Sequence, residues 1–184
     1  VYPRLQGPVL LLTSGKSNSL AASMEILSYL NQQGRKGEII HGTPAYIAER
    51  LRLLSKVHEA RQFLNGKNLG IIGQPSDWLI SSDPDREAVK SKLGLNLVDV
   101  PIDELVNLVK SDEDLSAYSH PQMEDIANNI PSAIQKYTQG ALRIYQALKK
   151  LIEKYQLSGL TLRCFDLLTA VENTGCLALA LLNA

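Results

Sequence analysis

The sequence has little cysteine, and what it has lies in surroundings that exclude two common uses of that residue. Its two cysteines, Cys164 and Cys176, have no Cys-x-x-Cys spacing and no histidine-rich neighbourhood. A disulfide framework is therefore not expected, and neither is a structural zinc site, which usually takes four ligands. We interpret both residues as reduced thiols of a cytoplasmic protein that could pair only by geometric accident.

The sequence also has no excess of basic or acidic residues and no long apolar run. The 19 basic and 19 acidic residues leave a net charge of zero, so the electrostatic surface that binds nucleic acid or an anionic membrane is not expected. No apolar run reaches the roughly 18 residues of a membrane-spanning helix. Neither a nucleic acid nor a membrane is therefore expected as a partner.

What the chain does have is an alternation of short apolar strands with amphipathic helices. Strands are predicted over residues 8–13, 38–41, 69–72, 94–100 and 160–165, and helices over 19–33, 44–64, 83–93, 101–110, 131–155 and the last ten residues. This order indicates an α/β fold with a mostly parallel Rossmann- or flavodoxin-like sheet flanked by helices.

The long helix over residues 44–64 is expected to link two sheet pieces. We therefore predict a partial N-terminal α/β subdomain over 1–66 and a second α/β subdomain over 67–184. The chain begins at Val1 and ends on an apolar helix at 175–184. Because an all-round apolar helix is normally buried, we expect the second subdomain to be truncated at its C-terminal end.

One stretch, residues 68–83, stands out as a possible wall of a ligand site. Its apolar strand breaks at Gly73 and Gln74, and a polar turn with Asp77 and the only tryptophan, Trp78, follows. In open α/β sheets, ligands bind outside the carboxyl ends of the strands. The alternative is an ordinary strand-to-helix turn with a packed tryptophan. Asp83 is expected to cap the next helix, with Pro84 as its first residue.

The last predicted strand carries an arginine, Arg163, among apolar residues and beside Cys164. An arginine there must find a partner or open onto a cavity, because burying its charge unpaired is very costly. A structural ion pair is the alternative. If this strand shares a sheet with residues 69–72, Arg163 and the turn at Gln74–Trp78 face the same crevice.

Two other patterns do not complete a known motif. Gly15-Lys16-Ser17 follows a strand, but the first glycine of a phosphate loop would fall on Leu10. The three histidines, His41, His58 and His120, have no ligand spacing, although His41 ends a strand and could face a crevice. A metal site built from this chain alone is not expected.

With these pieces in place, the chain resembles the sugar-isomerase superfamily of L-fucose isomerase, in its fucose isomerase-like branch. The resemblance spans nearly the whole chain and rests on residues 19–25, 66–82, 93–100 with 104–105, 162–165, 175–176 and 182–183.

The resemblance implies a cytoplasmic, homo-oligomeric enzyme of carbohydrate metabolism that uses Mn²⁺ to interconvert an aldose and a ketose. It also places the metal ligands and the catalytic carboxylates outside these 184 positions, so no catalytic or metal-binding residue is transferred. A sugar-contacting glutamine of the family corresponds to Arg163 here. The expected sugar-binding residues are Gln74, Asp77, Trp78, Arg163 and Cys164. The alternatives are a sugar-binding or regulatory module without catalysis, and an assembly domain joined through the last helix.

Overall fold

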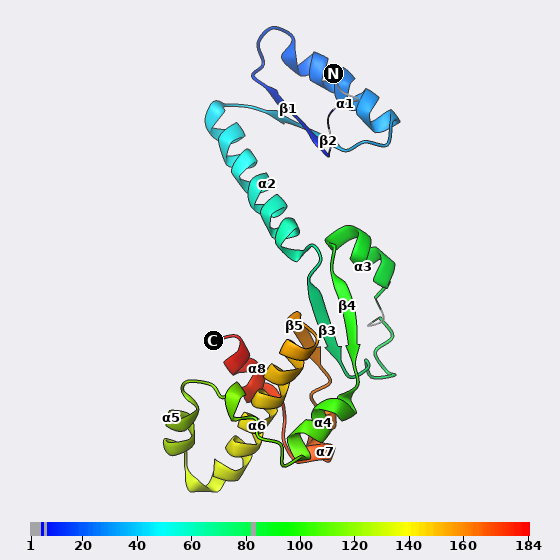
Figure 1. Cartoon of the computed structure of the whole chain (residues 1–184). Coiled ribbons are helices and arrows are strands. Elements are labelled where there is room, and N and C mark those ends of the chain that lie inside the picture. The colour runs from blue at the N-terminus through cyan, green and yellow to red at the C-terminus, as the bar shows by residue number, and fades with distance from the viewer. Residues whose placement is uncertain (1–4, 6, 82–83) are drawn as a thin grey trace. The chain divides into compact units, whose positions relative to one another are not determined.

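The computed structural model describes residues 5, 7–81 and 84–184, which form the predicted α/β fold (Figure 1). Helices flank two small parallel sheets, one in each of two compact units, Val1–Gln62 and Phe63–Ala184. The sequence indicated a division close by, near residue 66. Each unit is described by itself.

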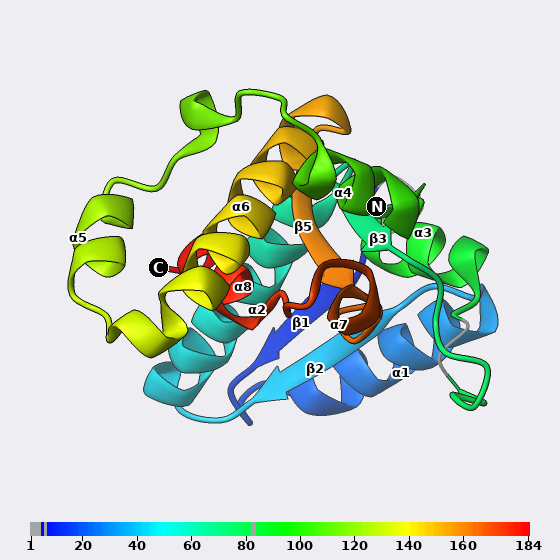
Figure 2. The ribbon, with the colours of Figure 1, turned by 90° about the horizontal axis from the view of Figure 1, so that it is seen from below.

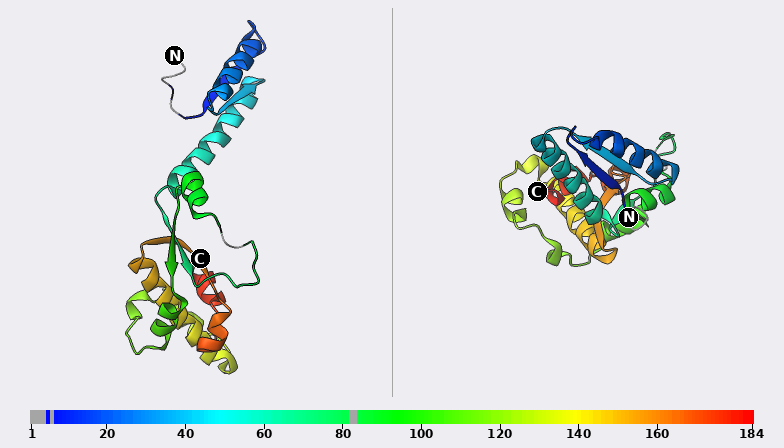
Figure 3. Two further views of the ribbon diagram at one scale, coloured as in Figure 1. Left: turned by 90° about the vertical axis from the view of Figure 1, so that its right-hand side faces the viewer. Right: turned by 90° about the horizontal axis from the view of Figure 1, so that it is seen from above.

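The first unit is a two-stranded parallel sheet with a helix along it. Strands β1 (Val9–Thr13) and β2 (Gly37–His41) pair along their full length. Helix α1 (Ser19–Gln32) lies along the sheet (Figure 3) and helps to bury Leu30 and Ile40, which are at most 1% exposed. The alternate residues of β1, Leu10 and Leu12, are exposed.

Helix α2 (Pro44–Leu64) begins and ends at the predicted residues, with Thr43 before it and Gly66 after it. The side-chain hydroxyl of Thr43 accepts a 3.3 Å hydrogen bond from the backbone N–H of Tyr46, which is the capping contact expected of threonine at this position. Arg50 attaches the helix to β2 through two hydrogen bonds to Glu38, of 2.7 and 2.9 Å. No residue of α2 is buried.

The second unit contains a three-stranded parallel sheet in the order β4-β3-β5, which confirms that the strand at 69–72 and the last strand share a sheet. Strand β3 (Asn68–Ile72) lies between β4 (Asn96–Val100) and β5 (Leu157–Leu162). Side chains alternate between the two faces. Ile72 and Val100 enter the core, whereas Ile71 lies on the opposite face.

The core of the second unit is built on helix α6 (Ser132–Lys154). The helix places an apolar stripe against the sheet and against α8 (Cys176–Leu182), which lies beside it in Figures 1 and 2. Seven residues of this stripe are at most 5% exposed: Ala141, Leu142, Ile144, Tyr145, Ala147, Leu148 and Leu151.

The remaining elements connect these layers. They are α3 (Arg86–Leu93), α4 (Ile102–Lys110), the 3-10 turn η2 (Ser116–Tyr118), α5 (Met123–Asn128) and α7 (Asp166–Val171). None of the helices within the described ranges combines the length and the apolarity needed to cross a bilayer.

Several predicted elements and bounds around β5 and α3 were wrong. Strand β5 ends at Leu162, because the backbone N–H of Cys164 turns back to the carbonyl of Leu162 at 2.8 Å, and Arg163 therefore follows the strand. The segment after it, predicted as a loop, forms α7. Helix α3 begins at Arg86, capped by the Asp85 carboxylate, which accepts the N–H of Ala88 at 3.0 Å. The predicted cap, Asp83, lies outside the described residues.

A hydrogen-bonded carboxylate joins α4 to the end of α6 and makes a prediction for stability. Glu104 accepts bonds from Lys154 Nζ (2.5 Å) and from the Tyr155 hydroxyl (2.6 Å). Burial by itself raises the pKa of Glu104, but these two donors outweigh it and hold the pKa below the ordinary value of 4.5. Glu104 therefore stabilises the fold fully above that value, and the contribution is lost as the pH falls through the lower folded-state pKa.

We expect Glu104→Gln to flatten this part of the acid dependence. Urea unfolding at about pH 6 and about pH 3 should show a larger acid-induced loss of stability in the wild type than in Glu104→Gln. Asp103→Asn, on the exposed side of the same helix, is the matched control and should behave as the wild type does. Equal losses in the wild type and in Glu104→Gln would contradict the assignment.

Candidate functional site

A pocket of about 370 Å³ lies where β3 and β5 end side by side. The two strands run in parallel and their last residues, Ile72 and Leu162, are in register, so the loops that follow them meet at the same edge of the sheet. The pocket continues over the sheet face opposite α6, where the paired residues Ile71 and Thr161 line it. Its other lining residues are Gly73, Gln74, Pro75, Ser76, Trp78, Leu79, Leu162, Arg163, Cys164, Phe165 and Asp166.

Gly73 allows the two strand ends to approach closely. Its φ of +83° lies in the left-handed region, and a Cβ on this residue would lie 2.7 Å from the Cβ of Arg163. Only glycine meets both conditions without strain. The backbone carbonyl of Gln74, the next residue, accepts a hydrogen bond of 3.1 Å from Nη1 of Arg163.

Arg163 makes an ion pair and also lines a pocket. The two alternatives for this residue, a structural ion pair and an arginine that opens onto a cavity, therefore do not exclude each other. Its Nε lies 2.9 Å from Oδ2 of Asp166, although that N–H is not aimed at the carboxylate and makes no hydrogen bond. The Arg163 side chain is 34% exposed, so the pair is partly screened and contributes little to stability. The guanidinium is held at the pocket by contacts from both loops.

Two exposed aromatic side chains belong to the same pocket, one from each loop. Trp78 is 77% exposed and Phe165 is 79% exposed. Trp78 does not pack into the core, so the alternative of a packed tryptophan in a plain turn is wrong. Exposed apolar rings beside a few placed polar groups are typical of small-molecule sites.

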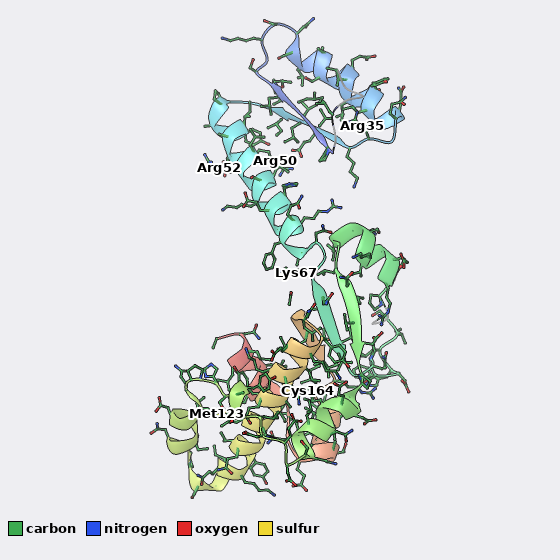
Figure 4. All side chains as sticks on the ribbon, viewed as in Figure 1. Arg35, Arg50, Arg52, Lys67, Met123 and Cys164 are labelled. Carbon is green, nitrogen blue, oxygen red and sulfur yellow. The ribbon has the colours of Figure 1, made fainter. Side chains whose placement is uncertain are left out.

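Cys164, another of the expected sugar-binding residues, is half-buried at the pocket wall. Figure 4 labels it within the second unit. Its sulfur accepts the N–H of Gly175 at 3.1 Å. Burial raises the pKa of the Cys164 thiol, and the N–H contact acts against this. The pocket therefore brings together Gln74, Trp78, Arg163 and Cys164. Asp77, the fifth expected residue, is exposed and does not line it.

Phe165 and Asp166 line the pocket but were not among the expected site residues. Both were assigned to the end of the last strand or to the loop beyond it. The available signal was the change from alternating apolar residues to Arg163-Cys164-Phe165-Asp166, which is unlike a buried strand and marks the end of one.

A second pocket, of about 530 Å³, lies in the first unit at the ends of β1 and β2. Its lining includes Lys16 and His41, and Nδ1 of His41 is 2.6 Å from the Thr13 hydroxyl. His41 therefore faces a crevice, as its position at a strand end suggested.

Within the described residues, no three histidine, cysteine, aspartate or glutamate side chains gather as a group that could hold a metal ion. Among the described residues, Asp166 is the carboxylate that lines the pocket at the ends of β3 and β5, and it is paired with Arg163.

Comparison with known proteins finds no protein-family model that matches the chain and no curated protein similar to it.

Proposed function

We propose that the pocket at the ends of β3 and β5 binds a small polyhydroxylated ligand of the sugar class. On this proposal the chain is the substrate-side portion of a fucose isomerase-like enzyme, cytoplasmic and homo-oligomeric. The supporting observation is that two exposed aromatic rings, Trp78 and Phe165, accompany Arg163 in one pocket at the joined carboxyl ends of parallel strands. The volume, about 370 Å³, is at the small end of ligand sites and suits a ligand of monosaccharide size.

The pocket offers a sugar both kinds of contact that it needs. A sugar has apolar C–H faces, which gain by leaving water against an aromatic ring. It also has hydroxyl groups, which need donors and acceptors. Arg163 has five N–H donors, of which its contacts with Gln74 and Asp166 occupy only part. The Asp166 carboxylate adds an acceptor.

The chemistry of the proposed enzyme would be completed by groups outside these positions. Aldose–ketose isomerisation moves a proton between C1 and C2 of an open-chain sugar through an enediol. This step needs a carboxylate base, and a divalent cation such as Mn²⁺ polarises the two oxygens. The part proposed for this chain is to hold and orient the sugar.

A second candidate function is a sugar-binding or regulatory module without catalysis. The observation that favours it is Arg163, which stands at the position corresponding to a sugar-contacting glutamine in the enzymes that the chain resembles. An arginine there supplies several N–H donors that can hold sugar hydroxyls, and it departs from the residue that those enzymes use.

The two functions predict different ligand preferences. Isomerases of this type act on the open-chain sugar, so the substrate-side portion of an enzyme should prefer an alditol, which has no ring. A non-catalytic module that binds the abundant ring form should prefer the methyl glycoside. We expect saturable changes in Trp78 fluorescence with sugars, and stronger binding of the alditol than of the methyl glycoside of the same configuration.

The titration uses a panel of pentoses and hexoses, and free N-acetyltryptophanamide controls for optical effects of the sugar. Preference for the methyl glycoside would replace the enzyme proposal with the module. The absence of saturable binding for every sugar would contradict both functions.

A further inference from the structure

The two cysteines, expected to be unrelated thiols, are brought together by the fold of the second unit. Cys164 follows β5 and Cys176 is the first residue of α8. The Cys164 sulfur accepts the N–H of Gly175, the residue next to Cys176, at 3.1 Å. Both residues carry free thiols. The start of α8 thus lies beside the end of β5, which brings the two cysteines close together although they are well separated in the sequence.

The two thiols differ in exposure and in ionisation. Cys176 is exposed, whereas Cys164 is half-buried at the pocket wall. Hydrogen bonds from the side chains of Thr174 and Cys164 lower the pKa of the Cys176 thiol. Burial first, and the neighbouring Cys176 after it, raise the pKa of Cys164. The accessible sulfur is therefore the one that ionises more readily, and the thiolate is the reactive form.

We propose that Cys176 and Cys164 form a thiol–disulfide exchange site that reacts with a low-molecular-weight disulfide such as oxidised glutathione. Cys176 is the attacking residue, and Cys164 is the resolving residue that closes an internal disulfide. The site shares Cys164 with the wall of the proposed sugar pocket, but its thiol chemistry does not require a bound sugar.

The reaction has two balanced steps. The Cys176 thiolate forms a bond to one sulfur of the small disulfide, whose S–S bond breaks and releases the other half as a thiolate. That thiolate takes the proton of the Cys164 thiol. The Cys164 sulfur then bonds to the Cys176 sulfur and breaks the mixed disulfide, releasing the second half as a thiolate that takes up a proton from water. Two protein thiols are oxidised, and one small disulfide is reduced to two thiols.

The geometry supports the second step in particular. Disulfide bonds form between residues whose sulfurs can approach without backbone movement. The Cys164 sulfur contacts the backbone N–H of Gly175, the residue directly before Cys176, so the resolving sulfur is close to the mixed disulfide as soon as that forms. The product would tie the turn after β5, which carries Arg163 and Phe165, to the start of α8.

The test uses the whole chain treated with excess oxidised glutathione, followed by alkylation of the remaining thiols and intact-mass measurement. The wild type should lose two hydrogen atoms and accept no alkyl group. Cys164→Ser, whose hydroxyl still accepts the Gly175 N–H, should instead accumulate one glutathione adduct on Cys176. Cys176→Ser should react at Cys164 at least about tenfold more slowly, because that thiol is less ionised and less accessible.

Peptide mapping of the wild type decides the proposal even if a variant folds poorly. A linked pair of peptides containing Cys164 and Cys176 supports it. A wild type that stays reduced, that keeps stable glutathione adducts, or that forms only disulfides between chains overturns it. Equal reaction rates of the two serine variants, with folding checked by circular dichroism, overturn the assignment of Cys176 as the attacking residue.

Discussion

Replacing Trp78 with alanine is expected to weaken sugar binding by the chain about tenfold or more, which corresponds to about 1.4 kcal/mol. Trp78 is 77% exposed in the free protein and lines the pocket. Its ring can therefore become buried only against a ligand, and the apolar area that leaves water then contributes to affinity. The exposure of the ring also means that its loss removes little stability from the fold.

Because the variant has no tryptophan, binding is measured by calorimetry and not by fluorescence. Ile80→Ala is the matched control, since Ile80 belongs to the same loop, is 98% exposed and does not line the pocket. We expect its affinity to stay within about twofold of the wild type, as for a surface change away from a site. Equal affinities in the wild type and in Trp78→Ala would contradict the proposed packing of the sugar against the Trp78 ring.

Replacing Leu148 with alanine should lower the free energy of unfolding of the second unit by about 2–5 kcal/mol. Leu148 is fully buried in the middle of α6, within the cluster that joins this helix to the sheet and to α8. The substitution removes buried methyl groups and leaves a cavity that rigid neighbours fill only in part. This loss is a large fraction of the stability of an ordinary domain.

Ile134→Ala is the control within the same helix, because Ile134 is 48% exposed. Its loss should be about 1 kcal/mol or less. Urea unfolding followed by far-ultraviolet circular dichroism measures both variants, and the two units are fitted as separate transitions because two-state behaviour is not assured across them. Similar losses for the two variants would show that α6 is not packed as described.

Much of the local structure was predictable because its signals lie close together in the sequence. The bounds of α2 followed from Thr43-Pro44 at its start and from Asn65-Gly66 after its end. Strand β3 was visible as an apolar run between glycines. Strand β5 was predicted too late in the sequence, with Arg163 inside it, because the turn after Leu162 depends on a backbone hydrogen bond that has no strong residue signal.

The candidate site could be predicted only in part. Gln74 and Trp78 were found because a polar turn after a buried strand is a local feature, and Arg163 because a charge in an apolar run is conspicuous. Phe165 was passed over because an aromatic residue at a strand end is ordinary in sequence. Its importance arises only from its place in the same pocket as Trp78.

By itself, the sequence determined the α/β class, the order of the elements and the absence of a complete phosphate loop. Hydrophobic period and turn chemistry are properties of neighbouring residues. Only the tertiary structure decided that β5 pairs with β3, that Gly73 meets Arg163, and that the Cys164 sulfur contacts Gly175, the residue before Cys176. These contacts join segments distant in sequence, and they form because burying one shared core around α6 fixes which strand ends and helix ends meet.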